Sequence, residues 1–137
     1  MRLRRTGHRP DVLKIMSGAP ANRLPAHRAT MCIYIVRYEW DDRKNELNQR
    51  KHGVSFELAA LAFEDPRCLI SFDREDQDGE LRWHAIGAVS IEAGVDAVVL
   101  VAHVYREARD GEEIIRIISA RAAETDEIRR YQEQEVE

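Results

Sequence analysis

The alternation of apolar and polar positions divides the chain into one strand, two helices, four further strands and a final helix. Runs rich in β-branched residues predict strands over residues 32–38, 67–72, 81–90, 97–106 and 114–120. Apolar residues at helical spacing predict helices over residues 42–52, 56–64 and 121–135. This β-α-α-β-β-β-β-α order predicts an α+β domain. We expect an antiparallel sheet with the two N-terminal helices packed on one face, and a C-terminal helix.

Local signals mark where these elements begin and end. Asp41 and Ser55 are suitable N-cap residues for the two early helices. Gly53 can adopt the left-handed conformation that ends the first of them. The Asp110-Gly111 pair predicts a tight hairpin turn, which supports antiparallel pairing among the later strands.

The charge of the chain changes sign after residue 30. Residues 1–30 contain seven Lys or Arg and one Asp, together with three prolines and no sustained periodicity. We therefore expect a disordered basic extension there, followed by one domain over residues 31–137. The remaining 107 residues contain 14 bases and 24 acids. Because such a domain has no general attraction for nucleic acid, binding RNA would require a local basic patch.

Cysteine content and hydropathy indicate the compartment. Cys32 and Cys68 form no CxxC motif, and reduced thiols suit a cytoplasmic protein. No apolar run approaches the roughly 20 residues that span a bilayer. We expect a cytoplasmic bacterial protein without a membrane partner.

Cationic and polar side chains gather on three neighbouring predicted strands. These residues are Arg82, His84, His103, Tyr105, Arg106, Arg116 and Arg121. Arg116 has apolar residues on both sides, in a run where a guanidinium is unusual. A guanidinium presents five donors in a fork that suits phosphate. This interpretation competes with ordinary half-buried sheet polarity, in which the arginines pair with loop acids or extend toward solvent.

The first predicted helix offers a second cationic group. Lys44 and Lys51 share one helix face, and His52 lies in the last turn. Cations there also suit the helix dipole alone, so a purely structural role stays open. His52, His84 and His103 could converge on a metal, but no HxH, HExxH or cysteine pair supports this. We predict no metal and no cofactor.

Several motifs together resemble the BrnT family of bacterial toxins. They include Tyr38-Glu39-Trp40-Asp41, Lys51-His52-Gly53-Val54-Ser55-Phe56-Glu57, Phe63-Glu64-Asp65-Pro66 and Arg116-Ile117-Ile118-Ser119-Ala120-Arg121. The resemblance covers about residues 37–131. It implies a RelE-like fold and a type II toxin that cleaves RNA without metal and inhibits translation and growth. It also implies a BrnA-like ribbon-helix-helix antitoxin in a toxin2–antitoxin2 heterotetramer, which contacts operator DNA only through the antitoxin.

RelE-like nucleases direct the ribose 2′-hydroxyl onto the adjacent phosphate. Under the resemblance, Arg82, Arg106, Arg116 and Arg121 would stabilise the phosphorane charge. His52 or His103 would transfer the proton, because histidine titrates near neutrality. Lys44, Lys51 and Tyr105 would bind RNA.

Two other hypotheses stay open. A catalytically degenerate module could only sequester an antitoxin and co-regulate transcription. In that case the arginines would each be held by acids instead of converging in an open groove. A plain RNA-binding domain could stack bases on Trp40, Trp83 and Tyr105, although aromatic residues are scattered through the sequence. For the toxin, we expect an acidic antitoxin segment to cover the cationic groove.

Overall fold

A six-stranded sheet in the order β1-β2-β6-β5-β4-β3 forms the centre of the protein. The computed structural model describes residues 13–17 and 33–134, with side chains from residue 36 onward. The strands are β1 (Leu13–Ser17), β2 (Ile33–Glu39), β3 (Leu69–Glu75), β4 (Leu81–Glu92), β5 (Val95–Glu107) and β6 (Glu113–Ala122). β2 and β6 run parallel and the other neighbouring strands run antiparallel. The expectation of a purely antiparallel sheet was wrong at this one pair, because β6 returns beside β2 in the same direction.

The first strand lies inside the segment expected to be a disordered extension. β1 pairs antiparallel with β2, from Leu13 opposite Arg37 to Ser17 opposite Ile33. Pairing there covers an edge of β2 that would otherwise present unpaired backbone groups. Expecting no regular structure in residues 1–30 was therefore wrong for β1, and the rest of that segment lies outside the described residues.

The helices follow the predicted capping signals. They are α1 (Asp42–His52), α2 (Phe56–Ala60), the 3-10 helix η2 (Leu61–Glu64) and α3 (Thr125–Glu133). Asp41 accepts hydrogen bonds from the N–H groups of Arg43 and Lys44, and Ser55 accepts one from Leu58. Gly53 ends α1 with a φ of 75°. Two predicted helices differ in the structure. The helix predicted over residues 56–64 becomes a 3-10 helix at residues 61–64. The helix predicted from residue 121 starts at Thr125, because β6 continues to Ala122.

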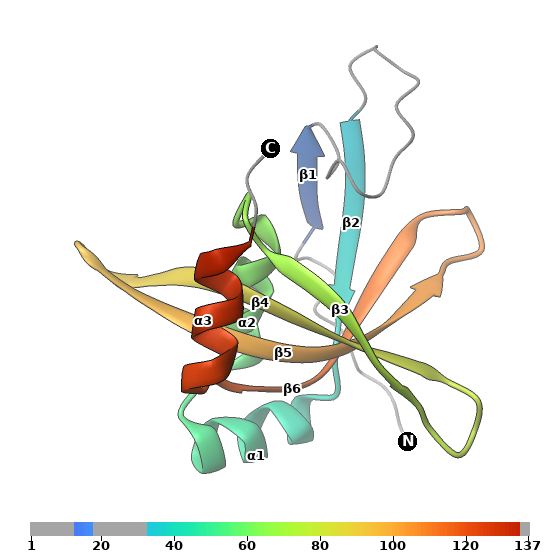
Figure 1. The fold of residues 1–137 in the computed structure, drawn as a ribbon. Coiled ribbons are helices and arrows are strands. Elements are labelled where there is room, and N and C mark those ends of the chain that lie inside the picture. Colours follow the sequence, from blue (N-terminus) through green and yellow to red (C-terminus); the bar gives the residue numbers. More distant parts are fainter. Residues whose placement is uncertain (1–12, 18–32, 135–137) are drawn as a thin grey trace.

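The two faces of the sheet are covered by different helices (Figure 1). α1, α2 and η2 contact β4, β5 and β6 on the face that we call the α1–α2 face, whereas α3 contacts β4 on the other, the α3 face. On the α1–α2 face, Val101, Ile117 and Tyr38 pack with Phe56 in the main core. On the α3 face, buried Ile86, Leu100, Val104 and Ile114 lie outside that cluster. Within the described residues, no helix combines the length and apolar character needed to cross a bilayer.

Candidate functional site

All six arginines in β2–β6 lie on the α3 face. They are Arg37, Arg74, Arg82, Arg106, Arg116 and Arg121. Register places them, because residues paired across neighbouring strands share a face. Arg116 pairs with Val104 and Arg121 pairs with Leu100, and both partners are buried on that face.

A β-bulge brings Arg116 and Arg121 to the same face. The two residues are five positions apart, so strict alternation would place them on opposite faces. The β5–β6 register shifts between Ala102 and His103, which leaves Ile118 without a paired residue. One extra residue reverses the alternation. The bulge therefore gathers the predicted arginines, and simple alternation could not have predicted it.

Arg106 and Arg116 meet at a single carboxylate. Glu39 Oε2 lies 2.9 Å from Arg106 Nη2 and 3.2 Å from Arg116 Nη1. Glu39 is paired with Arg116 across β2 and β6, which fixes this geometry in the backbone. One negative charge between two guanidinium groups leaves this cluster with a net positive charge.

No role for Glu39 was predicted from the sequence. Its position on a predicted strand, within a motif that the resemblance matched, was the available signal.

Arg121 connects the sheet to α3. Its Nη1 and Nη2 donate to the two carboxylate oxygens of Glu127 at 2.9 and 3.0 Å. This hydrogen bonding holds the pKa of Glu127 below its ordinary value and raises that of Arg121. Arg82 is 3.4 Å from Asp76. Each of the four predicted arginines therefore has a carboxylate partner, the arrangement expected for sheet polarity and for a degenerate module, although Arg106 and Arg116 converge on one carboxylate.

His103 lies away from the arginines. It shares the α1–α2 face with Trp83 and Ile117, its neighbours in register, and its exposed fraction is 0%. The rings of Phe63 and Tyr105 pack edge-to-face against it, at centroid distances of 4.8 and 5.0 Å. Burial lowers the pKa of His103 to about 4. A histidine in this position cannot reach the α3 face.

Of the three histidines in residues 33–134, His84 is the one that shares a face with the arginines. It lies two residues from Arg82 on β4 and pairs with Ala102, opposite Ser71 on the other side. Its Nε2 is 3.5 Å from Asp73 Oδ2, and its side chain is 30% exposed. Alternation along the predicted strand places His84 on the same face as Arg82, but the sequence predicted no role for it in proton transfer.

The other predicted site residues lie elsewhere. Lys44, Lys51 and His52 are exposed on α1, which packs against β6 on the α1–α2 face. Tyr105 is on that same face and is half-buried. Trp40 has an exposed fraction of 0%, so it cannot stack a base. The structure thus brings the four arginines to one face and places the helix cations, Tyr105 and His103 on the other.

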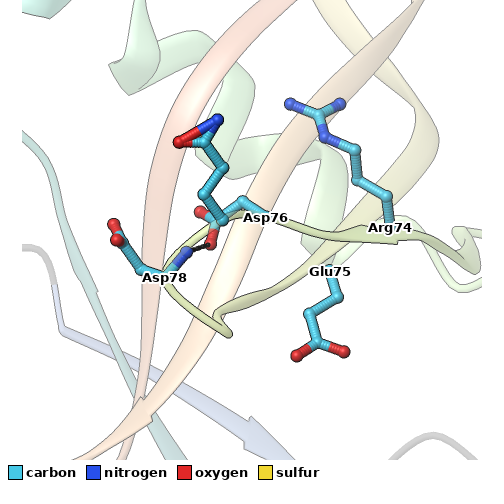
Figure 2. A pocket seen from close by; sticks show the side chains of 5 residues that line it. Arg74, Glu75, Asp76 and Asp78 are labelled. Carbon is cyan, nitrogen blue, oxygen red and sulfur yellow. Dashed lines mark hydrogen bonds between the residues drawn. The ribbon is translucent and has the colours of Figure 1, made fainter.

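A pocket lies at the turn between β3 and β4 (Figure 2). It is lined by Arg74, Glu75, Asp76, Gln77 and Asp78. Asp76 Oδ1 accepts the N–H groups of Asp78 and Glu80, each at 3.0 Å, and the Glu80 bond is the main cause of its lowered pKa. Three acids around one arginine do not suit a phosphate. We therefore interpret the pocket as a feature of the β3–β4 turn and not as an RNA-binding site.

Comparison with protein families gives one match. Residues 40–127 match the family described as the ribonuclease toxin, BrnT, of type II toxin-antitoxin systems. No curated protein matches the chain significantly. The matched region contains Arg82, His84, Arg106, Arg116 and Arg121. The chain therefore belongs to the BrnT family of type II toxin–antitoxin ribonuclease toxins, which implies an RNA substrate and an antitoxin partner.

Proposed function

We propose that this protein is a metal-independent endoribonuclease toxin, that its RNA cleavage arrests translation and growth, and that a BrnA-like antitoxin neutralises it. The observation that carries the proposal is the gathering of every arginine of β2–β6 on one sheet face, in a domain that is acidic in total. Directed guanidinium donors on one surface supply the local attraction for a phosphate backbone that the net charge does not.

The centre of the proposed site is the cluster of Arg106, Arg116 and Glu39. An RNA phosphate can replace the Glu39 carboxylate between the two guanidinium groups, because both anions accept the same forked donors. The arginines would then stabilise the charge that develops on the phosphorane, usually the largest contribution to catalysis. Arg82, on β4, extends the cationic surface along the same face.

His84 is the best placed residue for proton transfer. His84 on β4 and Arg116 on β6 are two strands apart and are offset by two residues along the strand direction, since His84 pairs with Ala102 and Arg116 pairs with Val104. With strands about 4.8 Å apart and about 3.3 Å of rise per residue, their backbones are roughly 12 Å apart. In the proposed reaction the 2′-oxygen forms a bond to phosphorus while the bond to the 5′-oxygen breaks. His84, oriented by Asp73, takes the 2′ proton, and the 5′-oxygen takes a proton from solvent. The products are a 2′,3′-cyclic phosphate and a 5′-hydroxyl.

The experiment is cleavage of single-stranded RNA by the purified full chain in EDTA. We expect products with 2′,3′-cyclic phosphate ends, and growth arrest on expression that the antitoxin relieves. Loss of cleavage in EDTA that a divalent ion restores would contradict metal independence. Intact RNA at every concentration, with normal growth at confirmed protein levels, would contradict the nuclease itself.

A further inference from the structure

Among the helices of residues 33–134, none covers one end of the α1–α2 face. The β3–β4 hairpin and the end of β5 extend beyond α1 and α2 (Figure 1). Phe72 is 52% exposed and Leu81 is 47% exposed on this end. With the half-buried Trp83 and Tyr105 they form what we call the aromatic patch. Large apolar side chains gathered this way indicate a binding surface.

The aromatic patch is preformed and anchored in the core. Phe72 packs edge-to-face on Trp83 at 5.3 Å, and Trp83 packs on Tyr105 at 6.0 Å. Tyr105 packs in turn on the buried His103 ring. Because these rings hold one another in place, a partner would pay little conformational entropy to bind them.

The charge beside the aromatic patch is negative. Glu75 is paired with Leu81, and Glu107 is two residues beyond Tyr105, so both lie on the α1–α2 face. Figure 2 shows Glu75 projecting away from Arg74 and Asp76. No arginine of β2–β6 lies on this face. An apolar centre beside exposed carboxylates repels an RNA backbone and attracts a basic partner.

We propose that the aromatic patch is the docking site of the antitoxin, which places there a segment with apolar side chains flanked by lysine or arginine. The proposal rests on the proposed function for the existence of that partner. It differs from the expectation that acids cover the arginines, since Arg82, Arg106, Arg116 and Arg121 already have carboxylate partners. β3 is the last strand of the sheet, so a segment docked on Phe72 can continue around that edge toward the α3 face.

The test compares two double variants of the full chain, each titrated with the antitoxin encoded beside it. F72S/L81S alters the aromatic patch. I91S/V95S is the matched control, because Ile91 and Val95 are exposed to similar extents, 51% and 42%, on the β4–β5 hairpin. We expect the patch variant to lose about tenfold or more in antitoxin affinity and the control to stay within about twofold. The charge variant E75K/E107K should weaken binding and reduce its salt dependence.

RNA cleavage by each variant without antitoxin separates this proposal from the proposed function. Wild-type cleavage by F72S/L81S with weakened antitoxin binding supports the docking site. Equal antitoxin affinity for both double variants overturns it, whether or not the protein cleaves RNA. Loss of RNA affinity in the patch variant would overturn it in favour of a base-stacking surface. If the wild-type chain self-associates and F72S/L81S does not, the proposal is overturned in favour of a second copy of the chain as the occupant of the patch. Deleting residues 1–12 could also raise the antitoxin affinity of the wild-type chain but not that of F72S/L81S. That result would assign the patch to residues 1–12 instead.

Discussion

Two histidines on neighbouring strands have opposite environments because strand residues alternate between faces. His103 is paired with Trp83, so His84, one position further along β4, lies on the other side of the sheet. Alternation along the predicted strand grouped His84 with Arg82, but it could not say which histidine meets the arginines of β5 and β6. That distinction depends on the register between β4, β5 and β6, including a bulge that no residue type marks. Residue chemistry and the grouping within a strand were therefore predictable, and the grouping across strands was not.

Replacing His84 with asparagine should slow RNA cleavage by about 10²-fold or more, since a positioned acid or base typically contributes that much. The thermal midpoint should change little, because the side chain is partly exposed and its contact with Asp73 is long. Single-turnover cleavage rates measure the effect. H52N is the matched control, because His52 is exposed on α1. A larger loss in H52N than in H84N would return the proton transfer to the predicted helix residue.

Replacing His103 with leucine should remove a pH dependence of stability. Burial lowers the pKa of His103 from 6.5 to about 4. Between these values the unfolded chain binds a proton that the folded chain does not, so wild-type stability falls as pH drops through this window. This loss in the free energy of unfolding is absent above pH 6.5 and reaches about 3 kcal/mol near pH 4. In urea titrations, the free energy of unfolding should differ less between pH 7 and pH 4.5 in H103L than in wild type. An unchanged difference would show that other groups cause the acid sensitivity.

At the scale of elements, the caps and turns were the most predictable features. α1 begins at Asp42 and ends at His52, as the capping signals predict, because those signals act within a few residues. The parallel β2–β6 pair and the strand β1 depend on contacts between distant segments. Composition predicted a structureless N-terminal segment, because it carries no information on the free edge of β2 that pairs with residues 13–17.

The docking of α3 depends on a few polar contacts. The Tyr131 hydroxyl donates to Asp65, which also accepts the N–H of Ala88 at 2.8 Å. Replacing Tyr131 with phenylalanine should lower the free energy of unfolding by about 1–2 kcal/mol, since the bond goes to a charged acceptor. Denaturant titration measures this, with Q132A as a control on the exposed side of α3. Equal stability of Y131F and wild type would show that the hydrogen bond contributes nothing net.

At the scale of the molecule, the sheet separates two kinds of surface. One face carries the strand arginines and α3, and the other carries the main core and, beyond the helices, the aromatic patch. Net charge alone predicted weak attraction for RNA, because a total cannot reveal that one face collects the arginines. We infer that this division lets one small domain bind RNA on one surface and the antitoxin on another.

The most direct test of the arginine face is the cleavage rate of Arg116→Ala in EDTA, compared with Arg129→Ala. Arg116 shares Glu39 with Arg106, so removing it leaves that carboxylate paired and the fold supported. Arg129 is an exposed arginine of α3 paired with Asp126, and serves as the matched control. We predict a loss of about 10²–10³-fold for Arg116→Ala with an unchanged thermal midpoint, and a rate within about twofold of wild type for Arg129→Ala. Wild-type cleavage by Arg116→Ala would contradict the assignment of the arginine face as the catalytic surface.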